Sequence, residues 1–433
     1  MFKILRPEKV YVTEDVYNDQ RAAARVEHMM TSIKPDVPLQ RVSYEKLNEI
    51  ASKRWISIPR WGANPNPRDP DIVLTTGKFW TQDEKKRFAE KYPHLSRRDL
   101  LGYTTHKFRH DGELDWRNKS KGIICQSAWE LHCIEGCAFR CAYCGYGGVI
   151  RMFVNLEEYL KHLPEILTLA PRQRLYKWDN ATDVSAFEPE LGASKLLVEY
   201  FAEHPTKYLE IYIGKSDNTD PLLDLNPKGH TILQWSISAR TQSTAIEPET
   251  APWNRRIEAA RRCQEAGYIV RFRFSPIVPV KNWQEENAEL IERIFARTKP
   301  DVISLCAFGW MSVEEAKACI DFDLLDPQYV AAMKAAAPFI SARGFTNGGG
   351  RPIPHDARAY MFKFLIDEIR KHHETVPISL CLETMEMWAL FERELGMPVN
   401  PYKKSSYYCN CGGTCTPEHP LSKGIIPGKS WFG

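Results

Sequence analysis

Short apolar runs alternate with amphipathic stretches over most of the chain. Four β-rich runs predict buried strands, at 208–213, 232–238, 269–275 and 301–306. The apolar positions with helical spacing lie at 155–167, 253–267, 283–298 and 355–373, and a last strand is predicted at 376–384. Asn155 is placed to cap the first of these helices, and Gly267 ends the second. Strands and helices in turn at this spacing indicate parallel βα units, which carry their sites at the carboxyl ends of the strands.

The pattern divides the chain into three predicted parts. Residues 1–121 are expected to form an N-terminal α/β extension, residues 122–384 the βα units, and residues 385–433 a cysteine-rich tail. Within the first part, residues 81–121 form a polar insertion with eleven Lys/Arg against seven Asp/Glu. That insertion is either a solvated excursion or a surface for a polyanion, because basic and aromatic residues interleave along it.

Composition and charge limit the classes of protein to which the chain can belong. The chain has 433 residues, of which 43% are hydrophobic and 26% charged, and a net charge of +3 that does not by itself support nucleic-acid binding. Its N-terminus lacks the apolar core of a signal peptide, and no apolar run is long enough to span a membrane. We therefore expect a cytoplasmic protein. In that reducing compartment, clustered cysteines bind metal or do redox chemistry more often than they form disulfides.

The segment CIEGCAFRCAYCGYGG, residues 133–148, concentrates the candidate chemistry. Cys137, Cys141 and Cys144 form a C-x3-C-x2-C motif, with the aromatic Tyr143 before the last cysteine. Structural zinc usually takes four ligands from two separated pairs, whereas three thiolates can hold a [4Fe–4S] cluster with one iron open. An open iron can bind S-adenosylmethionine (SAM), and this spacing is the radical-SAM signature. Cys133 falls outside the motif and is expected to be a buried small residue.

Further segments make the chain resemble the spore photoproduct lyase family of radical-SAM enzymes. The segments that carry this resemblance are EPETAPWNRRIEAARRCQEAGY (247–268), NATDV (180–184) and GKSDNTDPLLD (214–224). The resemblance covers roughly 8–80 and 125–384. It implies a partial (βα)6 barrel with the cluster in the first βα loop. It also implies SAM contacts from the residues that match family positions, namely Tyr143, Thr182, Asp183, Lys215 and Ser236.

Two positions depart from the family. The family lyase returns a hydrogen atom from a cysteine at the position of Asn180, and an amide cannot serve in that step. The family also keeps a relay tyrosine directly after the third cluster cysteine, where this chain has Gly145 and then Tyr146. We regard Tyr146 and Asn180 as candidate catalytic positions, and we predict that the protein does not repair thymine dimers.

A second set of cysteines lies in the tail, where Cys409, Cys411 and Cys415 form C-x-C-x3-C among glycines, and Cys381 precedes them as a candidate fourth ligand. Four thiolates suit structural zinc or a second iron–sulfur cluster. The alternatives are free cysteines in a loose tail, or a catalytic trio that supplies a hydrogen atom or binds a soft element.

Taken together, the sequence predicts an enzyme that cleaves SAM reductively at a [4Fe–4S] cluster. A 5′-deoxyadenosyl radical then abstracts hydrogen and a substrate bond is cleaved or rearranged. The expected partners are an external one-electron reductant of flavodoxin or ferredoxin type and a small substrate, such as a modified nucleobase like queuine, with modified nucleic acid left open. The alternatives are transfer of a 3-amino-3-carboxypropyl radical to a soft substrate at the tail cysteines, and a non-catalytic electron-transfer or regulatory protein.

Overall fold

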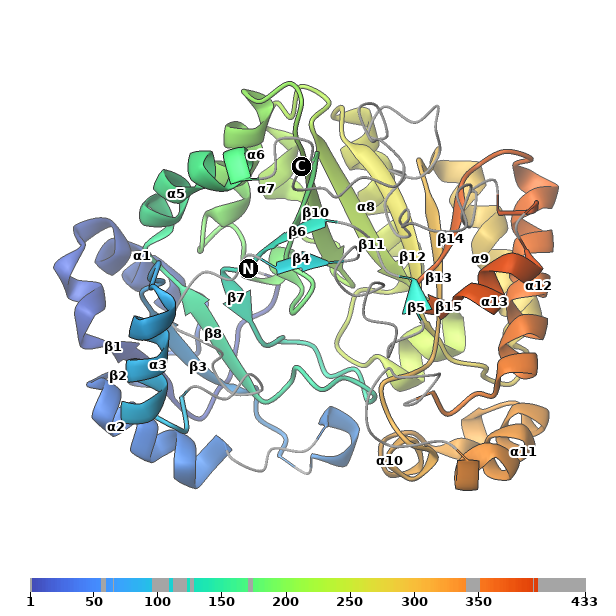
Figure 1. Cartoon of the computed structure of the whole chain (residues 1–433), viewed down its shortest axis with the longest axis horizontal. Coiled ribbons are helices and arrows are strands. Elements are labelled where there is room, and N and C mark those ends of the chain that lie inside the picture. The colour runs from blue at the N-terminus through green and yellow to red at the C-terminus, as the bar shows by residue number, and fades with distance from the viewer. Residues whose placement is uncertain are drawn as a thin grey trace.

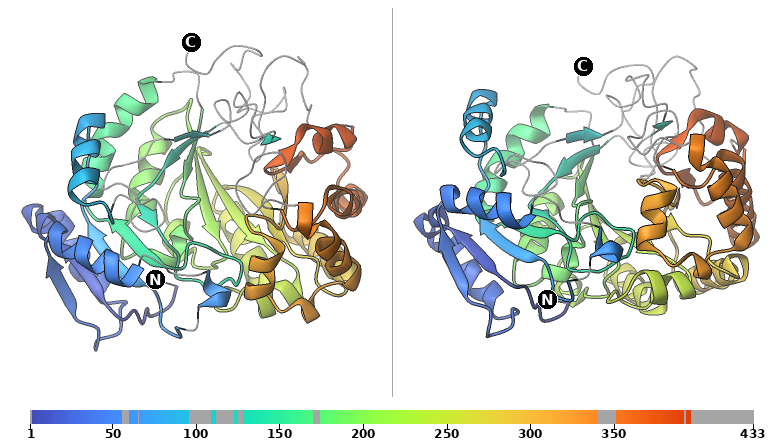
Figure 2. Two further views of the ribbon diagram at one scale, coloured as in Figure 1. Left: turned by 60° about the horizontal axis from the view of Figure 1, so that its bottom comes forward. Right: turned by 90° about the horizontal axis from the view of Figure 1, so that it is seen from below.

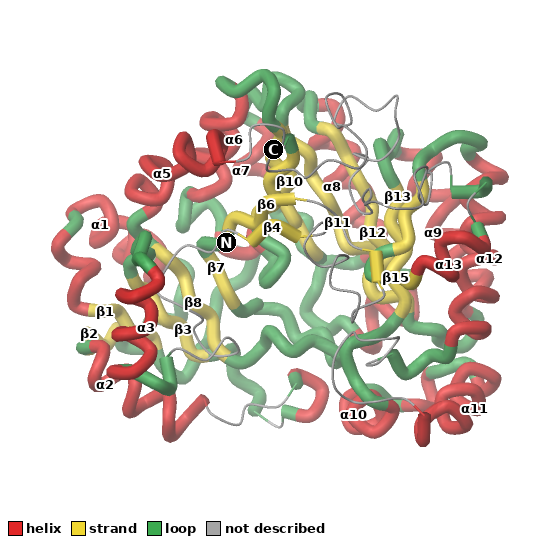
Figure 3. The backbone as a smooth tube through the Cα atoms, viewed as in Figure 1, coloured by secondary structure: helices red, strands yellow, loops and turns green. Residues whose placement is uncertain are grey.

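The computed structural model describes residues 2–55, 60–64, 66–95, 109–111, 123–124, 128–169, 174–339, 351–391 and 393–395. These residues form two groups of strands with helices packed against them (Figure 1). Figure 3 separates the two groups by colour, with one sheet near α1 to α3 and the other beside α8, α9 and α12. None of the described helices has the length and apolar character needed to cross a membrane.

The first sheet is built mainly from the N-terminal part of the chain. Its strands follow the order β2-β1-β3-β8-β7, all neighbours being parallel except β7 and β8. The strands are β1 (Val10–Thr13), β2 (Leu39–Val42), β3 (Asp71–Thr75), β7 (Ile134–Glu135) and β8 (Val149–Phe153). The helices beside them are α1 (Gln20–Met30), α2 (Tyr44–Ile50) and α3 (Gln82–Lys91).

The second sheet has the order β14-β13-β12-β11-β10-β9-β6-β4, in which every neighbouring pair is parallel except β4 and β6. Its strands are β4 (Arg109–Asp111), β6 (Ala128–Leu131), β9 (Leu175–Trp178), β10 (Tyr208–Gly214), β11 (Thr231–Ile237), β12 (Ile269–Ile277), β13 (Ile303–Ala307) and β14 (Ile378–Leu380). A separate antiparallel pair joins β5 (Ile123–Ile124) to β15 (Glu383–Thr384). The parallel βα units confirm the predicted α/β class, and among the described strands the sheet stays open between β14 and β4.

Helices follow most of the parallel strands and cover the outer face of the curved sheet (Figure 2). They are α5 (Leu156–Leu169), α6 (Ala193–Ala202), α7 (Asp220–Leu223), α8 (Trp253–Glu265), α9 (Trp283–Arg297), α10 (Val313–Cys319), α11 (Pro327–Ala336), α12 (His355–His372) and α13 (Met385–Leu390). Gly267 has a φ of +93°, which confirms its place just past the end of α8, where a residue with a side chain would be strained.

The two faces of the second sheet differ in chemistry because strand side chains alternate. Leu209, Ile211, Leu233, Val270 and Phe272 point toward the helices and share one apolar cluster with Val198, Phe201 and Ile257. Glu210, Gln234 and Arg271, which alternate with them, are polar yet buried. Gln234 donates to Glu210 at 3.2 Å and Arg271 donates to the same carboxylate at 3.1 Å, which gives the inner face a hydrogen-bonded lining.

Some elements differ from the prediction. Asn155 precedes α5 and its carbonyl accepts from the amide of Glu158 at 3.1 Å, while its side-chain amide exchanges hydrogen bonds with the backbone of Gly77, at 2.7 and 2.9 Å. The strand predicted at 376–384 is split into β14 and β15 by a turn at Cys381 and Leu382, where Leu382 has a φ of +56°. The predicted domain division at residue 121 stays a prediction; β8 pairs with β3 in the first sheet, and β4 pairs with β6 in the second.

Candidate active site at the cysteine loop

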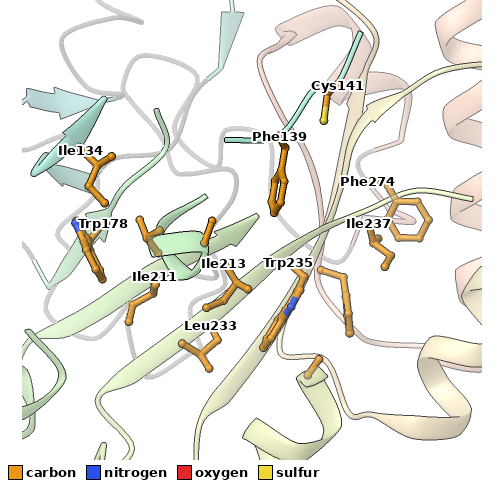
Figure 4. Packing of buried hydrophobic residues seen from close by; sticks show 14 of the residues in the cluster. Ile134, Phe139, Cys141, Trp178, Ile211, Ile213, Leu233, Trp235, Ile237 and Phe274 are labelled. Carbon is orange, nitrogen blue, oxygen red and sulfur yellow. The ribbon is translucent and has the colours of Figure 1, made fainter. Parts of the chain in front are cut away.

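The loop between β7 and β8 carries Cys137, Cys141 and Cys144. All three thiols are free, Cys141 is buried, and Cys137 and Cys144 are half-buried. The backbone is folded tightly around them, since Cys144 donates to the carbonyl of Cys141 at 2.9 Å and Cys137 donates to the carbonyl of Tyr146 at 2.9 Å. Burial raises the pKa of Cys137 to about 12, and the neighbouring charge of Cys144 adds to that increase. Figure 4 shows Phe139 of this loop directed toward the apolar residues of β10 and β11.

A segment from the N-terminal part holds the outside of the loop. The backbone amide of Trp61 donates a hydrogen bond to the carbonyl of Cys144 at 3.3 Å, and that of Gly62 donates to the carbonyl of Ala142 at 3.0 Å. The guanidinium of Arg60 donates to the carbonyl of Tyr143 at 2.9 Å and to that of Trp310 at 2.6 Å. Gly147 is pressed against the Trp61 indole, where an added Cβ would lie 1.6 Å from Nε1. The chain therefore clamps the cysteine loop from a segment more than sixty residues away.

The inner side of the loop is tied to a buried carboxylate. The hydroxyl of Tyr143 donates to Glu247 at 2.8 Å, and Ser238 and Gln242 donate to the same carboxylate at 2.6 and 2.9 Å. Arg256 of α8 contacts it at 3.2 Å. Burial opposes the ionised form, but the Lys215 and Arg256 charges hold the pKa of Glu247 below its usual range. Glu247 is therefore a buried anion that connects the loop to β11 and α8.

Lys215 lies at the end of β10 and faces this network. Its ammonium donates to the carbonyl of Ser275 at 3.1 Å, lies 3.9 Å from Glu247, and is 5.8 Å from the centre of the Tyr143 ring. Its amide and that of Ser216 donate to Asp183 at 2.5 and 2.9 Å. The structure therefore brings three predicted SAM contacts together, Tyr143 and Lys215 by their side chains and Asp183 through the backbone beside Lys215.

Two further predicted SAM contacts, Thr182 and Ser236, lie near strand ends. Thr182 follows β9, and its hydroxyl is buried without a hydrogen-bond partner among the described residues. Ser236 is half-buried on β11 and stands opposite Arg273 in the sheet register, on the polar face. Asp183 differs from both, because its two oxygens accept from backbone N–H groups and from Ser185, and burial raises its pKa to about 7.

Asn180 belongs to a separate polar cluster on β6 and β9. Its amide donates to Glu130 at 2.5 Å, and Glu130 lies 3.2 Å from His132, whose other ring nitrogen lies 2.7 Å from Asp179. Although burial disfavours the imidazolium, the charge and hydrogen bond of Asp179, followed by those of Glu130, raise the pKa of His132 to about 10. The cluster thus holds a cation between two buried carboxylates, with Asn180 at its edge.

The remaining predicted residues differ in where they lie. Tyr146 is 49% exposed, although its amide contacts the Cys144 sulfur at 3.4 Å. Cys133 is buried as expected. Cys381 lies beside Cys306 and not in the cysteine loop. Cys409, Cys411 and Cys415 lie outside the described residues, so their predicted metal site stays a prediction.

Several residues of these networks were not predicted from the sequence. Glu247, Arg256, Glu130 and His132 are all charged or titratable and all buried. Glu130 and His132 follow the alternation of a strand whose other residues are apolar, which was a usable signal. Glu247 opens the segment 247–268 that carries the family resemblance, but its contacts with Tyr143 and Lys215 come from distant parts of the chain and could not be predicted from that segment.

Comparisons with known proteins agree on one relationship. The spore photoproduct lyase family model matches residues 126–318. Spore photoproduct lyase of Bacillus subtilis (strain 168) is 30% identical over 174 residues, which are 39% of this chain and 51% of that protein. The Clostridium acetobutylicum protein of the same description is 26% identical over 172 residues, 38% of this chain and 51% of its own length. The chain thus spans about half the length of the curated relatives it matches.

Solved structures extend the likeness of the fold. A spore photoproduct lyase complexed with dinucleoside spore photoproduct has a TM-score of 0.60 and 16% identity, over 87% of this chain and 99% of that one. A mutant with bound AdoMet and dinucleoside spore photoproduct has the same TM-score, identity and coverage. At this identity the match concerns the fold.

Proposed function

We propose that the chain is a radical-SAM enzyme related to spore photoproduct lyase, and the family-model match over residues 126–318 supports this proposal. The finer proposal is that it cleaves SAM to a 5′-deoxyadenosyl radical, which abstracts hydrogen from a substrate so that one of its bonds is cleaved or rearranged. The observation that carries this proposal is the gathering of Tyr143, Lys215 and Glu247 against the loop of Cys137, Cys141 and Cys144.

The donor set fits a [4Fe–4S] cluster. Among the residues that the structure describes, no three His, Cys, Asp or Glu side chains surround a position for a single metal ion. A cubane cluster binds each thiolate on a different iron, so its three cysteines stand farther apart than the ligands of one ion. The buried Thr182 hydroxyl, which lacks a partner among the described residues, fits a polar ligand in the same region. With SAM bound, such a cluster would supply the reducing electron and the organic radical.

The residues of this chain would hold and orient the ligand. Lys215 places a cation where the carboxylate of a methionyl group can pair with it, within reach of Tyr143. Asp183 fixes the backbone of Lys215 and Ser216, so the ammonium starts from a defined position. Thr182 follows β9 and Ser236 lies on β11, so the two hydroxyls are offered from strands on either side of β10. Trp61 covers the loop and reduces access of water and oxygen from that side.

For the substrate, we propose a small polar molecule such as a modified nucleobase, for example queuine, rather than a thymine dimer. Support comes from Asn180, which donates to Glu130 where the family lyase has its hydrogen-donor cysteine. We further propose a flavodoxin- or ferredoxin-type protein as the electron source.

The test is SAM cleavage by anaerobically reconstituted protein with dithionite, analysed by liquid chromatography. The expected product is 5′-deoxyadenosine, lost in Cys141→Ala. Formation of 5′-methylthioadenosine instead would replace the proposed radical with a 3-amino-3-carboxypropyl one. If the protein binds a cluster but forms neither product, the enzymatic proposal fails and an electron-transfer role gains support.

A further inference from the structure

Two cysteines lie side by side at the carboxyl ends of β13 and β14. These strands are parallel with Leu305 opposite Leu380, and the amide of Cys381 donates to the carbonyl of Leu305 at 2.7 Å. Cys306 and Cys381 are therefore the next residues along the two strands, on the same face. Both are 2% exposed, and they form a small cluster packed against Trp310 and Leu382.

A guanidinium is directed at one of the two sulfurs. Arg273 of β12 donates from Nη2 to Cys381 Sγ at 2.9 Å, close enough for a charge-assisted hydrogen bond. A positive charge beside a thiol favours its thiolate, which is the nucleophilic form. Arg273 stands opposite Ser304 in the sheet register, two residues before Cys306, so the pair lies on the polar inner face.

The second sulfur has different surroundings. The Arg273 guanidinium contacts the sulfur of Cys381, whereas the Cys306 thiol donates toward the carbonyl of Ala307 at 3.9 Å. The positive charge therefore lies beside Cys381. An asymmetric pair of this kind differs from two inert buried cysteines, because one sulfur is prepared to attack and the other to follow.

The geometry allows the two sulfurs to join. Neighbouring strands lie roughly 4.7–4.9 Å apart, within the span of roughly 4.4–6.8 Å between the Cα atoms of bridged cysteines. We propose that Cys306 and Cys381 form a redox-active thiol pair on the inner face of the sheet, with Cys381 as the attacking and Cys306 as the resolving cysteine. The co-reactant is a low-molecular-weight disulfide.

The reaction balances as two thiol–disulfide exchanges. The Cys381 thiolate attacks one sulfur of the small disulfide, the S–S bond breaks, and one small thiolate leaves. Cys306 gives its proton to solvent and attacks the Cys381 sulfur of the mixed disulfide. The protein disulfide forms and the second small thiolate leaves, so the small disulfide gains the two electrons that the cysteine pair loses.

This thiol pair is not part of the proposed function, but it lies near the candidate active site. Trp310, which packs against the pair, accepts a hydrogen bond from Arg60 through its carbonyl, and Arg60 also binds the Tyr143 carbonyl in the cysteine loop. Closing the pair would tie β13 to β14 at the end of the sheet that carries the candidate active site. The pair could thus link thiol redox state to the shape of that site.

The experiment uses anaerobically reconstituted full-length protein in glutathione buffers of increasing oxidised fraction. Free thiols are blocked with N-ethylmaleimide, and peptides are mapped by mass spectrometry. We expect a Cys306–Cys381 linked peptide that disappears on return to a reducing buffer. Cys306→Ser should retain glutathione on Cys381, whereas Cys381→Ser should leave Cys306 modified at least about tenfold less. Arg273→Gln should slow the reaction about tenfold or more, with Arg273→Lys intermediate.

Cys263→Ser is the matched control, because Cys263 is a buried cysteine of α8 outside the pair. This variant should form the Cys306–Cys381 linked peptide to the same extent as the wild type. The proposal is overturned if iron-loaded protein forms no linked peptide in the most oxidising buffer, or if Cys381 links to a tail cysteine instead. Equal glutathione modification of the two single serine variants would also overturn it. Because the experiment detects a linked peptide and not SAM cleavage, failure of the thiol-pair proposal can be distinguished from failure of the proposed radical-SAM function.

Discussion

The hydroxyl of Tyr143 donates a 2.8 Å hydrogen bond to the fully buried carboxylate of Glu247. This contact joins the residue before the last cluster cysteine to a segment about a hundred residues later in the chain. The same carboxylate binds Arg256 and lies near Lys215, so one anion organises the loop and the predicted SAM contact. The loop geometry therefore depends on a charge outside the cysteine motif.

Replacing that charge should disturb the loop. Glu247→Gln keeps the size and shape of the side chain but removes the buried negative charge that pairs with Arg256 and lies near Lys215. Breaking a buried ion pair from one side costs about 3–5 kcal/mol, so we expect a matching loss of unfolding free energy and less iron per chain. Denaturant unfolding and iron analysis measure both. Glu249→Gln is the control, since Glu249 is 45% exposed and should change little; equal effects of the two substitutions would contradict the assigned role.

Lys215 should matter for SAM and not for the cluster. Lys215→Gln removes the cation near Tyr143 while Glu247 keeps its contact with Arg256. We expect SAM to bind about tenfold or more weakly, the scale of a charge-assisted hydrogen bond, with iron content unchanged. Calorimetric titration of reconstituted protein with SAM measures the affinity. Lys228→Gln, at a position 49% exposed, should bind SAM normally. Unaltered affinity in the Lys215 variant would exclude it as a SAM contact.

Two glycines of the cysteine loop should respond differently to alanine. At Gly147 a Cβ would lie 1.6 Å from Trp61 Nε1, so the indole that covers the loop must move. At Gly145 the nearest atom is the flexible end of Arg60 at 3.2 Å. We expect Gly147→Ala to lose bound iron and to lose its cluster faster in air, and Gly145→Ala to resemble the wild type. Absorbance decay of the reconstituted cluster compares them, and the reverse order would refute the packing argument.

The fold class could be predicted because its determinants are local. Apolar runs separated by amphipathic helices marked β10 to β13, and the spacing of Cys137, Cys141 and Cys144 marked the loop. Lys215 was identified through the family resemblance, and its position after an apolar strand supported that interpretation. The curvature of the sheet and its polar inner face could not be predicted in detail, because buried charges such as Glu210 and Arg271 resemble solvated residues until the strands are aligned.

Long-range contacts set the limit of prediction at the site. The clamp from Arg60 and Trp61 joins segments that no local pattern connects. The position of Cys381 beside Cys306 depends on the register of β13 and β14, which no local pattern predicts, and the predicted link of Cys381 to the tail cysteines stays a prediction. Asn155 has the residue type of a cap, but a tertiary contact with Gly77 engages its side chain.

His132 should make stability depend on pH. Its pKa is about 10 in the folded protein against an ordinary value of 6.5, so its contribution is complete below about pH 6.5 and is lost as the pH rises toward 10. The free energy of unfolding of the wild type should exceed that of His132→Gln by about 2 kcal/mol or more at pH 6. This difference in stability should shrink by pH 10. Urea unfolding at several pH values measures it. The control is His28→Gln, at an exposed position, whose stability relative to the wild type should not change with pH. If the stability difference between the wild type and His132→Gln instead widens as the pH rises, His132 is neutral in the folded protein.

The position of Asn180 predicts the substrates that the protein does not repair. Its amide donates to Glu130 at 2.5 Å, inside a network with His132 and Asp179. An amide is a poor hydrogen-atom donor, so reconstituted protein should form 5′-deoxyadenosine yet release no thymine monomers from dinucleoside spore photoproduct. The Bacillus subtilis protein described as spore photoproduct lyase is the positive control, assayed by liquid chromatography under the same reductant. Asn180→Cys tests the site itself, because a thiol there should still fail if Glu130 and its partners are arranged for a different substrate. Repair by the unmodified protein would contradict the proposed divergence, and repair gained only in the cysteine variant would assign the divergence to Asn180 alone.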